Sequence, residues 1–170
     1  MKDSTWQGMS RMNKEESYHW AAKRVRAQVT RHVDVVATLA NTAAILKEYR
    51  PDFFWVGFYL LKEDDLVLGP FQGPPACVKL RLEKGVCAAC ARSAEAVIVP
   101  DVDSFPGHIA CDERSKSEIA IPVLDGEGLV RAVLDVDSEK RDDFDETDRR
   151  GLEVIAKLLK KIWDVPKNAV

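Results

Sequence analysis

The segment EIAIPVLDGEGLVRAVLDV, residues 118–136, holds two apolar runs separated by a short polar turn that contains glycine. Runs of this length that are rich in Val and Ile are typical of strands, and the Asp125-Gly126 pair favours a tight reversal between them. We therefore predict a β-hairpin with strands at residues 118–123 and 129–136, which closes a larger sheet.

Upstream of this hairpin the sequence predicts the rest of that sheet. The predicted strands are the aromatic run 53–61 with its hairpin partner 66–71, the alternating run 77–82, and residues 96–99. The alternation in 77–82 puts the leucines on one face and Cys77, Lys79 and Arg81 on the other. These strands and the hairpin would together form an antiparallel sheet.

Helices are predicted on either side of the strands. Residues 14–49 have helical periodicity and form two helices that end before Pro51, residues 86–94 form a short helix, and the acidic cluster at 145–148 opens the last one. This order favours an α+β fold, an antiparallel sheet with helices packed on one face. We expect a ligand pocket on the other face, under the long loop 101–116.

The composition describes an ordinary globular domain. The chain has 170 residues, of which 46% are hydrophobic and 31% charged, and its formal net charge is −3. We expect a loose tail at residues 1–12 and one domain at residues 13–165. No run reaches the roughly 20 apolar residues of a membrane span, and residues 1–7 lack the apolar core of a signal peptide. We therefore expect a cytoplasmic protein without membrane contact, and the acidic charge argues against nucleic acid as a partner.

The cysteines point to sulfur chemistry. Cys111 lies in the segment PGHIACD, residues 106–112. A thiol in a Pro/Gly turn among titratable side chains is more accessible than one inside an apolar helix or strand, and its thiolate fraction can be tuned. Cys111 is therefore a candidate nucleophile. Either Cys77 or Cys87 could then condense with its oxidised sulfur to form a disulfide.

A metal site is the alternative explanation for these residues. Cys87-x-x-Cys90 and His108-x-x-Cys111 together would offer four ligands to a structural zinc ion. However, the first pair lies in an alanine-rich helical stretch instead of a glycine-bearing turn, and a chain of this length needs no metal staple. We therefore expect no metal, and we expect Cys90 to pack as a small apolar side chain.

Three acidic residues stand in otherwise apolar strands. Asp135 and Asp137 alternate along one predicted strand and share a face, while Glu118 begins its neighbour. They are either solvent-facing strand ends or a pocket cluster in which mutual repulsion keeps one carboxyl protonated. A protonated carboxyl can donate a hydrogen bond to a substrate oxygen, and ionised ones can bind an ammonium group. Trp55 and Tyr59, which share a strand face, fit either the core or an aromatic pocket wall.

Taken together, these stretches resemble the free methionine-(R)-sulfoxide reductase family, whose members are built on a single GAF domain. The resemblance covers roughly residues 36–160. It rests on the stretches WVGFYL (55–60), LGPFQG (68–73), FPGHIACD (105–112), SEI (117–119) and LDVDS (134–138). The chain departs from the family pattern after Cys87, where Ala88 stands in place of a glycine, and Cys90 is additional.

The resemblance implies a role for each candidate residue. Cys111 would be the catalytic cysteine, with Cys77 as its resolving partner and Cys87 as the alternative. The substrate-binding carboxyls would be Glu118, Asp135 and Asp137, and the aromatic wall around the methyl group would be Trp55 and Tyr59. Family membership further implies a homodimer that needs no cofactor or metal and is recycled by a thioredoxin-type reductant.

The function expected from these residues is the reduction of free L-methionine-(R)-sulfoxide to methionine. The Cys111 thiolate would attack the sulfoxide sulfur while a protonated carboxyl, with Glu118 as first choice, hydrogen-bonds the oxygen. A sulfenic acid on Cys111 would then be resolved to a disulfide. The alternative is a GAF sensor module that binds a small ligand without chemistry, which fold alone does not exclude.

Overall fold

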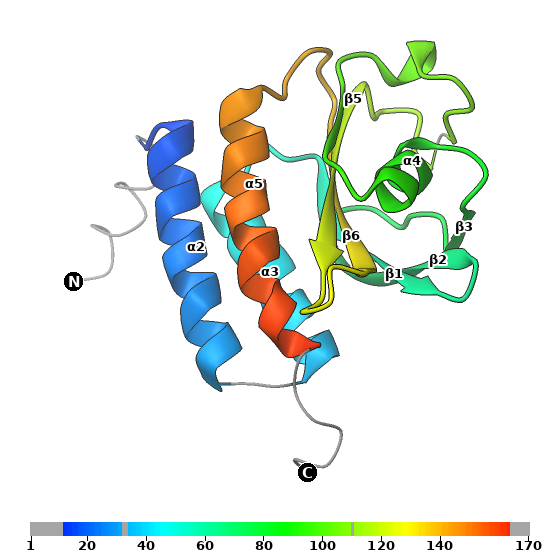
Figure 1. Cartoon of the computed structure of the whole chain (residues 1–170). Coiled ribbons are helices and arrows are strands. Elements are labelled where there is room, and N and C mark those ends of the chain that lie inside the picture. Colours follow the sequence, from blue (N-terminus) through cyan, green and yellow to red (C-terminus); the bar gives the residue numbers. More distant parts are fainter. Residues whose placement is uncertain (1–11, 32–33, 110, 164–170) are drawn as a thin grey trace.

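A six-stranded antiparallel sheet forms the centre of the computed structural model, which describes residues 12–31, 34–109 and 111–163 (Figure 1). Its strands lie in the order β3-β2-β1-β6-β5-β4. Their bounds are β1 Trp55–Lys62, β2 Asp65–Gln72, β3 Lys79–Arg81, β4 Val97–Val99, β5 Ser117–Leu124 and β6 Val130–Ser138. The predicted hairpins are present, and β6 pairs with both β1 and β5 at the centre of the sheet.

Helices cover the two faces of this sheet unequally. Three long helices, α2 (Lys14–Arg31), α3 (Val35–Tyr49) and α5 (Glu146–Leu159), lie together on one face, and the short helix α4 (Val86–Ser93) lies on the other (Figure 1). Two short 3-10 helices, η1 (Val102–Ser104) and η2 (Lys160–Ile162), complete the elements. The expected α+β fold class is confirmed. Within the described ranges, no helix has the length and apolar character needed to span a membrane.

The sheet separates two apolar clusters. The larger lies between the sheet and the three long helices, and fully buried side chains such as Leu39, Phe58 and Leu152 belong to it. Each large side chain of this kind contributes roughly 1.5–3 kcal/mol through burial. The smaller cluster lies on the α4 face and includes Trp55 and Tyr59. The first cluster therefore supplies most of the core, and the second builds the wall of a pocket.

A buried ionic network ties the three long helices together. Asp145 caps α5, and its side chain accepts from the backbone N–H of Asp148 in a capping box. The fully buried carboxylate of Asp148 accepts hydrogen bonds from the Tyr18 hydroxyl at 2.8 Å and from Arg50 Nη1 at 2.6 Å. Lys14 reaches the other carboxylate oxygen at 2.5 Å. The start of α5 is thereby fixed against α2 and the end of α3.

One strand prediction is confirmed only in part: Leu80 is buried while Lys79 and Arg81 are exposed, as expected, but the strand is shorter than predicted. The run 77–82 was expected to be a strand carrying Cys77, Lys79 and Arg81 on one face, but β3 contains only residues 79–81. Cys77 lies outside it because its carbonyl accepts a hydrogen bond from the Tyr59 hydroxyl and its sulfur is bonded to another cysteine. The predicted loose tail lies, except for Met12, outside the described residues, and the domain limits 13–165 stay a prediction.

Candidate active site

The pairing of the central strands gathers the three acidic residues. Glu118 on β5 lies opposite Asp137 on β6. Asp135, two residues earlier on β6, lies opposite Ala120 on one side and Gly57 on the other. Residues opposite each other in antiparallel strands point to the same face, so the three carboxyls project toward the α4 side. The prediction that Asp135 and Asp137 share a face is confirmed.

Two of these carboxyls are buried and Asp137 is half-buried, so none of them is a strand end in solvent. Glu118 is 7% exposed and Asp135 is 6% exposed. Burial raises the pKa of Glu118 well above its ordinary value, and the nearby charges of Asp135 and Asp137 raise it further. Burial likewise raises the pKa of Asp135 and of Asp137. The Ser115 hydroxyl, which donates to Asp137 Oδ1 at 2.8 Å, opposes the shift there. Glu118 and Asp137 are consequently the carboxyls best suited to hold a proton near neutral pH.

An aromatic stack forms one wall beside the carboxyls. The ring of Trp55 stacks on Phe71 with centroids 5.4 Å apart and on Tyr59 at 6.1 Å. Trp55 Nε1 donates to the carbonyl of Pro74 at 3.1 Å, which fixes the indole ring. A Cβ atom at Gly57 would lie 2.5 Å from Trp55 Cη2. Only glycine therefore leaves room for the ring at this point of β1.

A disulfide joins Cys77 to Cys111, with their Cα atoms 5.4 Å apart. Cys111 comes from the long loop before β5, and Cys77 comes from the segment between β2 and β3. The Tyr59 hydroxyl donates to the carbonyl of Cys77 at 3.0 Å and lies 4.0 Å from Cys111 Sγ. Tyr59 thus contacts both cysteines, and the sulfur pair lies next to the aromatic wall.

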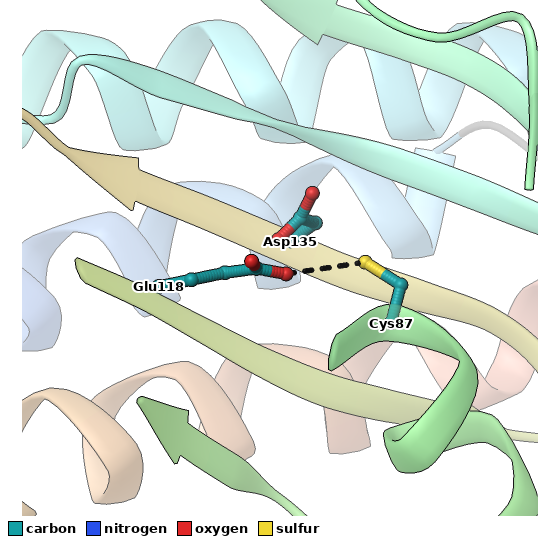
Figure 2. Close-up of side chains that lie close together, drawn as sticks. All are labelled: Cys87, Glu118 and Asp135. Carbon is teal, nitrogen blue, oxygen red and sulfur yellow. Dashed lines mark hydrogen bonds between the residues drawn. The ribbon is translucent and has the colours of Figure 1, made fainter. Parts of the chain in front are cut away.

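Cys87 is placed differently from the two bonded cysteines. Gly85, whose φ of +93° suits glycine alone, leads the chain into α4. Cys87 in the first turn then points at the carboxyl cluster, and its thiol donates to Glu118 Oε1 with a separation of 3.6 Å (Figure 2). Burial, together with the charges of Asp135 and Glu118, raises the pKa of the Cys87 thiol well above its ordinary value. Cys87 is therefore a neutral thiol in this state and a poor nucleophile.

A pocket opens between α4, the long loop and the sheet. Seven of the eight predicted site residues line it: Trp55, Tyr59, Cys87, Cys111, Glu118, Asp135 and Asp137. Cys77, the eighth, lies behind Cys111 as its disulfide partner and is not part of the lining. The cavity has a volume of about 40 Å³, enough for a few water molecules. The pocket of the disulfide form therefore has little free space.

The four zinc ligands considered from the sequence do not come together in a single metal site. Among the described residues, the one group of three or more potential metal ligands consists of Cys87, Glu118 and Asp135, without Cys90 or His108. Cys111 is already bonded to Cys77. Cys90 has no exposed surface and packs in the apolar cluster on the α4 face, as predicted. The C-x-x-C and H-x-x-C pairs therefore do not form a common metal site in the part of the chain that the structure describes.

Several residues of the site escaped the sequence analysis. Ser115, which hydrogen-bonds Asp137, lies in the loop without any motif around it. At the rim, Arg114 forms a bidentate ion pair with Asp112, with contacts of 2.9 and 2.7 Å, and its guanidinium lies 4.7 Å from the centre of the Phe54 ring. Gly57 could have been identified from the sequence, since a glycine inside an aromatic strand indicates close approach of another group.

Comparisons with known proteins agree with this geometry. The GAF domain family model matches residues 32–163. The chain is 47% identical over 152 residues to GAF domain-containing protein A of Dictyostelium discoideum, which covers 89% of this chain and 95% of that protein. It is 41% identical over 151 residues to free methionine-R-sulfoxide reductase of Escherichia coli, covering 89% and 91%.

Solved structures show the same relationship. The X-ray structure of free methionine-R-sulfoxide reductase from Neisseria meningitidis, in complex with its substrate, matches with a TM-score of 0.88 at 44% identity. That match covers 94% of this chain and 95% of the Neisseria chain. With the expected GAF fold, the shared sequence and the disulfide beside buried carboxyls in place, this chain belongs to the free methionine-(R)-sulfoxide reductase family of GAF-domain proteins.

Proposed function

We propose that this protein reduces free L-methionine-(R)-sulfoxide to L-methionine, with Cys111 as the nucleophile and Cys77 as the resolving thiol. The observation that carries the proposal is the disulfide between these cysteines beside a pocket lined by two buried carboxyls, Glu118 and Asp135, and by the half-buried Asp137. A sensor module that only binds a ligand needs no thiol pair that can be oxidised at its ligand pocket. The printed name and substrate complex of the Neisseria relative support the same reaction class.

In the first step the reduced Cys111 thiolate attacks the sulfur of the sulfoxide. The oxygen passes to Cys111 as a sulfenic acid, the substrate sulfur gains the electron pair, and methionine leaves. Glu118 supplies the proton that this transfer requires, since burial and the charges of Asp135 and Asp137 raise its pKa well above the ordinary value. The reaction reduces the sulfoxide by two electrons and oxidises Cys111 by two.

In the second step Cys77 attacks the sulfenic acid. The new bond is the Cys77–Cys111 disulfide, and the oxygen leaves as water. Cys77 is favoured over Cys87 for this role because it is bonded to Cys111 in the structure, while burial and carboxylate charges keep Cys87 protonated. Cys87 would instead hold Glu118 in place through its hydrogen bond.

Substrate recognition follows from the lining. The ionised carboxyls, Asp135 in particular, would bind the ammonium group, and the Trp55–Tyr59 stack would surround the methyl and thioether end. The disulfide form has room for a few waters only. We therefore infer that reduction releases the Cys111 loop and opens the pocket. Closure of the loop over a bound amino acid would leave no exit for a peptide chain, which restricts the reaction to free methionine sulfoxide.

The proposal includes the cellular setting expected from the family. A thioredoxin-type reductant would reduce the disulfide after each turnover, because Cys111 is exposed on its loop. We further propose a cytoplasmic homodimer that uses no cofactor. These points are open to direct test by steady-state kinetics with purified thioredoxin and by light scattering.

The decisive experiment is a single-turnover assay of the reduced protein without added reductant. The R epimer of free methionine sulfoxide should give one methionine per chain, and the S epimer none. Cys111→Ser should give none. Cys77→Ser should give one methionine and leave a sulfenic acid that dimedone traps.

Cys90→Ala serves as the matched control, because it removes a buried thiol outside the reaction and should behave as the wild type. Binding of either epimer without formation of methionine would favour the sensor module. A Cys77→Ser protein that forms a Cys87–Cys111 disulfide instead of a trapped sulfenic acid would transfer the resolving role to Cys87.

A further inference from the structure

Three potential metal ligands meet at the inner end of the pocket. Cys87 Sγ, a carboxylate oxygen of Glu118 and a carboxylate oxygen of Asp135 all lie within 4.8 Å of one another. Figure 2 shows them converging from three different elements, α4, β5 and β6. The distance between Cys87 Sγ and Glu118 Oε1 is 3.6 Å. All three residues are buried.

These separations suit a small tetrahedral ion. Zinc binds thiolate sulfur at about 2.3 Å and carboxylate oxygen at about 2.0–2.2 Å, which places tetrahedral ligands about 3.5 Å apart. The sulfur and Glu118 oxygen already have this spacing, and shifts of about 1 Å would bring in Asp135. One thiolate with two carboxylates favours zinc-like ions over magnesium and calcium, which prefer all-oxygen ligands.

A separate observation indicates that this position accepts a cation. Asp135 Oδ1 is buried, and no hydrogen-bond donor among the described residues reaches it. A buried carboxylate oxygen without a partner is costly. No basic side chain in the described ranges forms an ion pair with Glu118 or Asp135 either. The cluster is therefore a buried group of acidic ligands that lacks a positive partner.

We infer that Cys87, Glu118 and Asp135 form a binding site for one zinc-like divalent cation, which inhibits the enzyme. The ion displaces the protons of the Cys87 thiol and the Glu118 carboxyl to solvent, and its fourth position faces the pocket. It is not a resident cofactor, since it occupies the carboxyls that the reaction needs. The binding stands on the geometry alone, whereas the inhibition rests on the proposed function.

The test uses Co²⁺, which binds zinc sites and reports thiolate ligation through its sulfur-to-metal charge-transfer band. Metal-free protein is titrated with Co²⁺ in both the disulfide form and the fully reduced form. Because the site contains neither Cys77 nor Cys111, both forms should bind one ion per chain and show the band, and Zn²⁺ should bleach it. A band found only after reduction of the disulfide would overturn the inference.

Variants identify the ligands. Cys87→Ser should abolish the band, and Asp135→Asn should weaken Co²⁺ binding by at least about tenfold, the loss seen when even an outer group of a metal site is removed. Cys90→Ala is the matched control, a buried thiol one turn further along α4, and should bind Co²⁺ as the wild type does. A band that survives Cys87→Ser, or that is lost in Cys90→Ala, would refute the assignment. Circular dichroism verifies that each variant is folded. If Asp135→Asn does not fold, Glu118→Gln supplies a second variant of a metal ligand.

Inhibition is measured separately. Zn²⁺ should raise the KM for methionine sulfoxide in the wild type and leave kcat unchanged at saturating substrate, as competition for one site requires. If the protein binds Co²⁺ but shows no reductase activity, the metal site is supported and the proposed function is refuted. Full activity with the metal site saturated would refute the inhibition.

Discussion

Replacement of Gly57 by alanine would put a Cβ atom 2.4 Å from the Cβ of Phe71 and 2.5 Å from Cη2 of Trp55. Both neighbours must move by about 1 Å before ordinary van der Waals contact is restored. Overpacking of this kind costs about 1–3 kcal/mol, and the lower chain entropy of unfolded alanine returns about 0.4–1 kcal/mol. The difference spans about 0–2.6 kcal/mol. We expect a net loss near the middle of this range, about 1–2 kcal/mol, which corresponds to a fall in Tm of about 2–8 °C.

The same displacement should impair the reaction. Trp55 stacks on both Phe71 and Tyr59, so its movement disturbs the wall that contacts Cys77 and Cys111. Since a misplacement of about 1 Å can cost on the order of 100-fold, we expect kcat/KM to fall by about ten- to a hundredfold. Differential scanning calorimetry and the methionine sulfoxide assay measure the two effects.

A second glycine provides the control. A Cβ atom on Gly151 in α5 would lie 2.2 Å from the Tyr18 ring, on the opposite face of the sheet from the pocket. Gly151→Ala should lower Tm but leave the kcat/KM of the folded protein unchanged. Equal losses of kcat/KM in the two variants would refute the aromatic-wall argument, and an unchanged Tm in Gly57→Ala would refute the packing argument.

Three further results are expected. Asp148→Ala leaves the buried guanidinium of Arg50 with the half-exposed Asp52 as its remaining carboxylate partner, so urea denaturation should show a loss of about 3–5 kcal/mol. Loss of that half-exposed partner in Asp52→Asn should cost less than about 1 kcal/mol, and similar losses in both variants would show that burial of Asp148 does not matter. The pKa of Glu118 is raised in the folded state, so its contribution to stability is full at low pH and is lost as pH rises through the folded pKa. Glu118→Gln should therefore stabilise the protein relative to wild type at pH 8 and not at pH 4, and an equal effect at both values would contradict the shifted pKa. Isothermal titration of the disulfide form with methionine sulfoxide should detect no binding while the reduced form binds, and equal affinities would show that the closed cavity does not exclude substrate.

The strand pattern and the pocket face could both be predicted from sequence because they depend on local periodicity. Alternation places Asp135 and Asp137 on one face, and the apolar run after Glu118 makes it the start of a strand; their convergence then follows from the antiparallel pairing of neighbouring strands. Trp55 and Tyr59 are four residues apart on β1, so they likewise lie on one face of the strand. These inferences needed no knowledge of distant contacts.

Other features depended on contacts between distant segments, and they were missed or left open. The sequence could not choose between Cys77 and Cys87 as the partner of Cys111, because that choice depends on where the long loop folds back. The strand within 77–82 is shorter than predicted for the same reason, since the hydrogen bond from Tyr59 and the disulfide engage Cys77 outside the strand. Ser115 bonds Asp137 across 22 positions of sequence, and no local pattern marks such a pair.

The disulfide has a consequence for the durability of the protein. It closes a loop of 34 residues that includes all of α4 and β4, and in the chain-entropy description a loop of this length stabilises a fold by roughly 3–4 kcal/mol. In the proposed cycle the oxidised form is the spent enzyme, and the reduced form is the one ready to react. A cell that runs short of reductant would therefore accumulate the longer-lived, inactive form. The molecules that resist proteolysis would be those that have turned over and have not yet been reduced.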